Sequence, residues 1–132
     1  MGYLFAFDAV NNIFRASWEG PITDDILLEG YTAGGRLLAS RLPCRGLQDF
    51  TEVTTAEISN ETILKLAQMP PIYGVDSTVV FVAPKDFHYG LLRMFSIFGE
   101  KNRPNRHVVH TIEEAYKLLK VHAPQFSRIS ID

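Results

Sequence analysis

The stretch that decides the fold runs from Leu47 to Ala67 and reads LQDFTEVTTAEISNETILKLA. Leu47 to Phe50 predicts a strand, and an acidic, threonine-rich loop follows it. Ser59 can then cap a helix of about ten residues, which Pro70-Pro71 ends. Ligands and partners of α/β proteins usually meet the sheet where a strand ends and the next helix begins. We therefore look first for a site in this stretch.

The residues before this stretch predict a hairpin and a helix. Segments 3–10 and 13–19 are β-rich, and Asn11-Asn12 between them suits a two-residue turn. Alternation in the second segment makes Trp18 a core anchor, with a binding role as the alternative. Gly20-Pro21 should end that strand. Thr23 is placed to cap a helix that runs to about Leu42.

Gly34-Gly35 lies within this helix pattern. Each glycine should cost on the order of 1 kcal/mol relative to alanine, so we expect close backbone packing to offset them. The pair follows no strand and is therefore no phosphate-binding loop.

The residues after the central stretch alternate between strands and helices. Residues 78–83 are apolar on both faces, as in a strand inside a sheet. A helix over 85–99, a strand over 106–110 and a helix opened by Thr111 and ended by Pro124 follow. The tail from Phe126 to Ile131 is an added strand, a dimer arm or a frayed end.

The expected order is thus β-β-α-β-α-β-α-β-α, an α/β fold with one mixed sheet that opens on a hairpin and has largely parallel later strands. A chain of 132 residues suits one domain, 1–132. Apolar residues make up 46% of it, and its net charge of −2 lacks the basic bias of a nucleic-acid binder. The longest apolar run, Val79 to Ala83, is too short to span a membrane.

No residue pattern amounts to a catalytic or metal-binding signature. The single cysteine, Cys44, is interpreted as a core residue in a cytoplasmic protein without disulfides. His107 and His110 point to opposite faces of a predicted strand, so they cannot chelate one metal. Asp49, Glu52, Glu57 and Glu61 either compensate the helix dipole and aid solubility or, on an enzymatic interpretation, serve acid/base chemistry. No cofactor is expected.

Several motifs resemble the STAS superfamily, in particular its SpoIIAA-like branch of anti-sigma-factor antagonist domains. Asp49-Phe50-Thr51 looks like that family's strand end, and Glu57-Ile58-Ser59-Asn60 falls where its phosphorylated segment opens a helix. The other matching motifs are Gly20-Pro-Ile-Thr23, Ala83-Pro84, Tyr89-Gly-Leu-Leu-Arg-Met-Phe95 and Thr111-Ile-Glu-Glu-Ala115. The resemblance implies a regulatory module in a bacterial-type cytoplasm.

One position departs from the family pattern. Ile58 stands where the family has its phosphorylated serine, and it has no hydroxyl. Ser59 is adjacent, where a phosphate would sit at a helix N-terminus, although an ordinary N-cap explains it as well. A switch loop would then consist of Asp49, Thr51 and Ser59.

Two functions remain open, and both use the helix over 85–99. This segment is apolar around much of its circumference, so it buries two faces inside the domain or binds something else. The first function is a non-catalytic STAS-like module that binds a protein partner or forms a homodimer. The alternative is a carrier or sensor of a lipid or other apolar small molecule. The expected partner or ligand face consists of Phe87, His88, Tyr89, Arg93, Met94 and Phe98.

Overall fold

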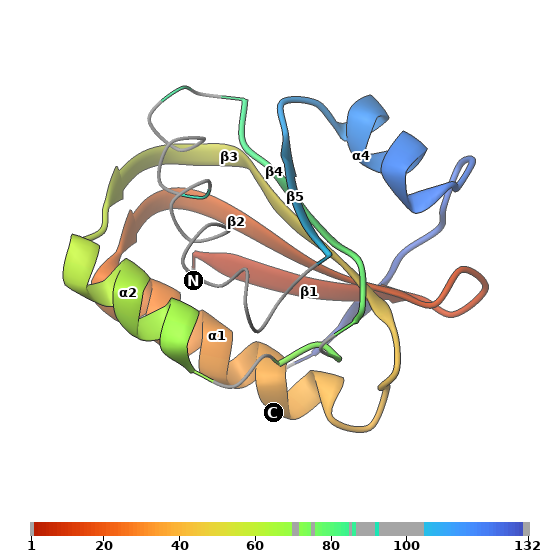
Figure 1. The fold of residues 1–132 in the computed structure, drawn as a ribbon, viewed down its shortest axis with the longest axis horizontal. Helices are drawn as coiled ribbons and strands as arrows, with labels where there is room; N and C mark the ends of the chain where they lie inside the picture. Colours follow the sequence, from red (N-terminus) through yellow and green to blue (C-terminus); the bar gives the residue numbers. More distant parts are fainter. Residues whose placement is uncertain are drawn as a thin grey trace.

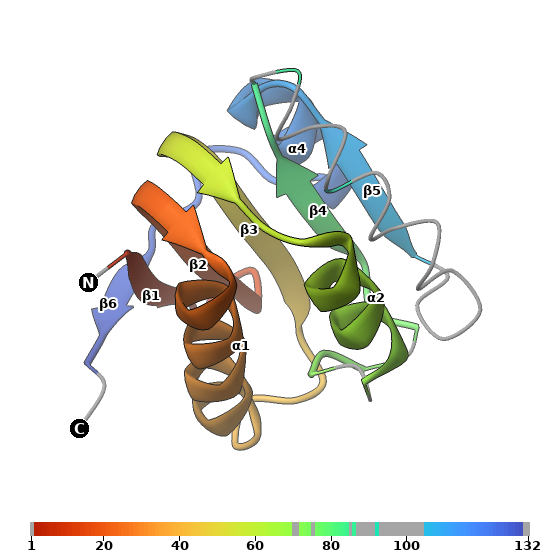
Figure 2. The same cartoon turned by 90° about the vertical axis from the view of Figure 1, so that its left-hand side faces the viewer.

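The computed structural model describes residues 2–69, 72–74, 76–84, 86, 92 and 105–130. Its strands form one mixed sheet in the order β5-β4-β3-β2-β1-β6 (Figures 1 and 2). Among the described residues, no helix is long and apolar enough to cross a membrane. The α/β class and the single mixed sheet are confirmed. The bounds of the elements are β1 Tyr3–Asp8, β2 Ile13–Thr23, α1 Asp24–Leu38, β3 Arg45–Glu57, α2 Asn60–Gln68, β4 Val79–Val82, β5 Arg106–Val109, α4 Ile112–Leu119 and β6 Ser127–Ile129.

The sheet has an antiparallel and a parallel half. β1 pairs antiparallel with both β2 and β6, whereas β2, β3, β4 and β5 run parallel to one another. Helices α1 and α2 lie on one face and α4 lies on the other (Figure 2). Each face has its own apolar cluster, the larger under α1 and α2 and the smaller under α4. β4 is buried at all four residues between the two clusters, which confirms the expected inner strand.

The opening hairpin has a longer turn than expected. β1 ends at Asp8, not Val10, and β2 begins at Ile13, so four residues turn the chain instead of two. The reason is the Asp8 carboxylate, which accepts the backbone N–H groups of Val10 and Asn11 at 3.0 Å each. Asn12 then takes a positive φ of 57°, which asparagine tolerates.

Gly20-Pro21 does not end β2, which continues to Thr23. Gly20 adopts a φ of 71° where the register with β3 shifts, as at a β-bulge. β1 pairs with β2 only as far as Trp18. Pro21 therefore lies where β2 has no β1 neighbour, and its missing N–H breaks no bond on that side.

β3 is also longer than expected, because residues 51–57 are strand and not loop. Its partner is the β2 extension, with the register reaching Thr23 opposite Glu57. β-branched residues such as Val53 and Thr54 favour this extended pairing. The two long strands project beyond β4, which pairs with β3 only as far as Asp49.

The starts of the described helices α1, α2 and α4 were predicted correctly, but the ends of α1 and α4 were not. Thr23, Ser59 and Thr111 each accept a backbone N–H in the first turn, at 3.4, 3.1 and 3.1 Å. α1 ends at Leu38, before Leu42, where the chain tightens into a turn in which the Arg41 N–H donates to the Leu38 carbonyl oxygen at 2.8 Å. α4 ends at Leu119, before Pro124, because Lys120 caps it in the left-handed conformation with a φ of 55°.

The C-terminal tail is an added strand. Residues 127–129 pair antiparallel with β1, with Phe5 opposite Ile129. Asp8 fixes the approach to this strand, because its carboxylate also accepts the N–H of Gln125 at 3.0 Å.

Candidate ligand pocket

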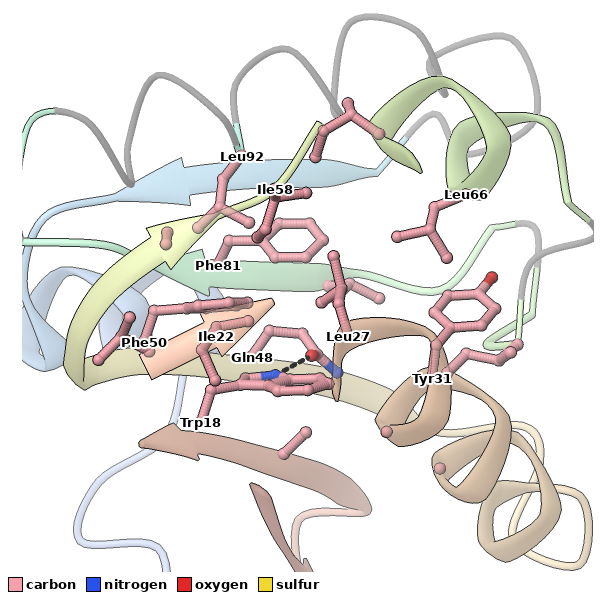
Figure 3. Close-up of a pocket in the computed structure, with 18 of the residues that line it drawn as sticks. Trp18, Ile22, Leu27, Tyr31, Gln48, Phe50, Ile58, Leu66, Phe81 and Leu92 are labelled. Atoms are coloured by element: carbon pink, nitrogen blue, oxygen red, sulfur yellow. Dashed lines mark hydrogen bonds between the residues drawn. The ribbon is translucent and has the colours of Figure 1, made fainter. Parts of the chain in front are cut away.

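An apolar pocket lies between the sheet and helices α1 and α2 (Figure 3). It holds about 80 Å³ in which the centre of a water-sized sphere can move. About 10–15 Å³ in that measure is enough for one water molecule, so the pocket has room for a small organic molecule. Its walls come from strands β1 to β5, the two helices, the 72–74 segment, Ile58 and Leu92.

Aromatic rings form much of the pocket wall. The Trp18 and Phe50 rings stack with centroids 5.6 Å apart and planes at 15°. Phe5 and Phe14 are in contact at 5.6 Å between centroids, and Phe14 meets Tyr73 edge-on at 6.3 Å. Trp18 is thus the core anchor that the alternation predicted, with 3% of its surface exposed, and it is also a pocket residue.

A β-bulge in β3 sets which of its side chains line the pocket. Gln48 and Phe50 face the pocket side, as strand alternation requires. The register then shifts between Ser17 and Glu19 of β2, and Val53 returns to the same face. The long β3 strand can therefore supply pocket residues along its whole length, as far as Ala56.

The glycines of α1 let the helix backbone lie close to neighbouring side chains. A Cβ atom on Gly30 would lie 2.4 Å from the Trp18 ring, a contact that proteins do not tolerate. A Cβ on Gly34 would lie 3.3 Å from Phe5, and one on Gly35 would lie 3.3 Å from Ile72. The expected tight packing at Gly34-Gly35 is present, and the tightest contact is one turn earlier, at Gly30.

A chain of hydrogen bonds crosses the polar part of the pocket wall. Trp18 Nε1 donates to Gln48 Oε1 at 2.9 Å (Figure 3), and Gln48 Nε2 donates to the Tyr73 hydroxyl at 3.0 Å. The Tyr73 hydroxyl donates in turn to the carbonyl oxygen of Phe14 at 3.2 Å. Burial raises the pKa of Tyr73 well above its usual value, so this hydroxyl keeps its proton.

Arg106 is the only charged side chain among the described residues that line the pocket. It stands at the start of β5 and donates from Nη1 to the carbonyl oxygen of Ser77 at 2.6 Å. Lys101 and Arg103, the basic residues that precede it in the sequence, lie outside the described ranges.

The expected partner or ligand face belongs to the predicted helix over 85–99. Its members, Phe87, His88, Tyr89, Arg93, Met94 and Phe98, all lie outside the described residues. Leu92, from the same predicted helix, is described; it is 9% exposed and lines the pocket.

The three residues of the expected switch loop are described, but they do not form a loop. Asp49 and Thr51 belong to β3, and Asp49 Oδ1 accepts the backbone N–H of Thr51 at 2.9 Å. Strand alternation puts Asp49 on the sheet face opposite its pocket-lining neighbours Gln48 and Phe50. Ser59 caps α2.

Ser59 also joins the starts of the two helices. Its N–H donates to Asp24 Oδ1 and its hydroxyl donates to Asp24 Oδ2, both at 2.9 Å. The backbone N–H of Ser59 is the main reason that the pKa of Asp24 lies below its usual value. A phosphate on Ser59 would therefore face a carboxylate as well as a helix N-terminus.

The remaining candidates for chemistry are dispersed. Glu52, Glu57 and Glu61 are exposed. Cys44 is buried, and burial raises the pKa of its thiol to about 11. Within the described ranges, no three His, Cys, Asp or Glu side chains are grouped so that they could hold a metal ion.

Sequence reasoning missed the pocket residues that carry polar groups. Gln48 was part of the central stretch, but the sequence does not show a partner for its amide, because Trp18 and Tyr73 are 30 and 25 residues away.

Comparison with protein-family models, curated proteins and solved structures found no match.

Proposed function

We propose that this chain is a non-catalytic binding domain that holds an apolar small molecule in the pocket under α1 and α2. The observation that carries the proposal is the pocket itself, an apolar hollow with a few convergent polar groups. This is the feature expected of a carrier or sensor of a lipid-like or other apolar ligand. Gln48, Tyr73 and Arg106 supply the polar groups among the described residues.

The energetic cost of the hollow supports this function. Protein interiors are close-packed, so the apolar side chains that line this hollow lack packing partners on one side, at a cost in stability. Larger side chains at Ala16 or Ala56, which both line it, would remove that cost. A bound ligand would offset the same cost by restoring the missing contacts.

Ile58 favours a ligand over a phosphorylation switch. On the STAS resemblance it stands at the family's serine position, and here it lines the pocket (Figure 3) and packs against the larger apolar cluster. An apolar side chain suits a binding wall, whereas a phosphoserine would bring charge into it.

A second candidate is a STAS-like regulatory module that binds a protein partner or a second copy of itself. It is supported by the order of the elements from β1 to β4, which is the order expected for that superfamily over this part of the chain, and by the position of capped helix α2 directly after β3. Sedimentation of the purified protein tests the homodimer. A strict monomer at all concentrations would exclude self-association.

The pocket proposal is tested by filling the pocket. Ala56→Leu places a larger side chain in the pocket wall, and Thr54→Leu places a leucine at an exposed position of the same strand. Protein purified from cells is examined by native mass spectrometry, and its Tm is measured with a panel of apolar compounds. We expect bound compound or a raised Tm for the wild type and T54L but not for A56L. Equal responses of T54L and A56L would contradict the proposal.

A further inference from the structure

The hydrogen-bond chain in the pocket has a fixed direction, which identifies the polar group that a ligand must carry. An indole N–H can only donate, so Trp18 forces the Gln48 amide to turn its oxygen toward Nε1. The amide nitrogen is then the donor to Tyr73. The Tyr73 proton goes to the Phe14 carbonyl, which can only accept.

With the bonds in this direction, one hydrogen of the Gln48 amide nitrogen is not used. The Gln48 Nε2 group carries two hydrogens, and among the described residues only the Tyr73 hydroxyl accepts from it. Gln48 is 9% exposed, so water has little access to the second hydrogen. A buried N–H without an acceptor is costlier and rarer than an oxygen with one unused lone pair. The pocket therefore lacks an acceptor more than it lacks a donor.

The charge near the pocket has the same preference. Arg106 is cationic, and no carboxylate is among the described residues that line the pocket. Among the described pocket residues, a ligand amine would meet no carboxylate, and the Gln48 oxygen already accepts a hydrogen bond from Trp18. A ligand oxygen would meet the remaining Gln48 hydrogen and a favourable potential from Arg106.

We infer that the ligand is a small apolar molecule with one carbonyl-type oxygen, neutral or carboxylate, held by Gln48 Nε2. This inference rests on the proposed function, since it assigns the chemistry of the same pocket. The pocket volume of about 80 Å³ limits the ligand to a few heavy atoms in this conformation.

The test uses four matched probes and the only tryptophan of the chain as reporter. Pentane, 2-pentanone, pentanoate and pentylamine each have five carbon atoms and differ in the polar group that they carry. Their binding to the full chain is measured by the shift of the Trp18 indole N–H signal in NMR spectra. One neutral hydrogen bond should make 2-pentanone bind about three- to tenfold more tightly than pentane. Pentylamine should bind more weakly than pentane.

Variants identify the donor and the charge. Gln48→Met keeps the side-chain length without the amide, and it should remove the preference for 2-pentanone over pentane. Tyr73→Phe leaves the amide in place with both hydrogens unused, and it should keep the preference. If the natural group is a carboxylate, Arg106→Met should weaken the binding of pentanoate and leave the binding of 2-pentanone unchanged. If Q48M does not fold, the comparison of the four probes on the wild type still tests the inferred ligand oxygen.

The outcomes separate the two proposals. Equal binding of pentane, 2-pentanone and pentylamine would overturn the inferred oxygen and leave the pocket proposal standing. No binding of any probe, pentane included, would contradict both. Binding of 2-pentanone without pentanoate supports the inference and assigns a neutral oxygen.

Discussion

Trp18 and Gln48, 30 residues apart in the sequence, are joined by a 2.9 Å hydrogen bond in the wall of an apolar pocket. The bond fixes the orientation of the Gln48 amide and keeps the indole N–H satisfied in a buried position. Gln48→Leu should therefore lower the free energy of unfolding by about 1–3 kcal/mol, because it leaves the buried indole N–H of Trp18 without an acceptor. Urea denaturation measures this loss, and an unchanged unfolding midpoint would show that the bond carries no stability.

Gly30 should not tolerate a methyl group, whereas Gly34 should. The two glycines lie in the same helix and gain the same propensity from alanine, about 0.5–1 kcal/mol. Gly30→Ala puts the new carbon 2.4 Å from Trp18 and should cost about 1–3 kcal/mol through overpacking. Gly34→Ala meets Phe5 at 3.3 Å, where a small shift of the ring suffices. Thermal unfolding of the pair checks this, and equal Tm values would refute the contact.

A negative charge at Ser59 should destabilise the junction of the two helices. Aspartate is as good an N-cap as serine, but at this position it would face the Asp24 carboxylate. We expect Ser59→Asp to unfold at lower urea than Ser59→Asn, which is a neutral cap of equal rank. Adding Asp24→Asn to S59D should recover part of the loss. If the double-mutant cycle showed no coupling energy between the two substitutions, it would contradict the proposed repulsion between residue 59 and Asp24.

Asp8 should make the fold sensitive to acid. Burial alone would raise the pKa of this carboxyl, but hydrogen bonds from Asn11, Gln125 and Val10 outweigh it and hold the pKa below 3.8. A depressed pKa contributes stability that is complete above the unfolded value and is lost as pH falls through the folded value. The free energy of unfolding should thus decline below about pH 3.8.

Variants separate this effect from general acid unfolding. Asp8→Asn should be less stable at neutral pH, because an amide presents hydrogens to the N–H donors that now surround the carboxylate, and its stability should change less below pH 3.8. Asp25→Asn, at an exposed position of α1, is the matched control for the removal of one carboxylate. Parallel pH profiles for the wild type and D8N would contradict the assignment.

Local signals in the sequence predicted the caps and the inner strand. Thr23, Ser59 and Thr111 act on neighbours three residues away, so their patterns are visible in the chain itself. The extension of β2 and β3 could not be predicted in this way. Gly20-Pro21 has the composition of a turn, and only the pairing of the two strands with each other keeps it extended.

The pocket could be predicted even less, because its wall is assembled from distant segments. Ile58, Leu92 and Tyr73 meet there through the topology, with no spacing that links them. The apolar stripe expected in the 85–99 segment lies outside the described residues, whereas Leu92, which is described, lines the pocket.

The most direct test of the pocket is the position of a bound probe. Intermolecular nuclear Overhauser effects are measured between 2-pentanone and the protein. The account predicts contacts from the methyl protons of the probe to the ring protons of Trp18 and Phe81, which both line the pocket. Contacts confined to exposed side chains such as Val10 and Leu118 would contradict it.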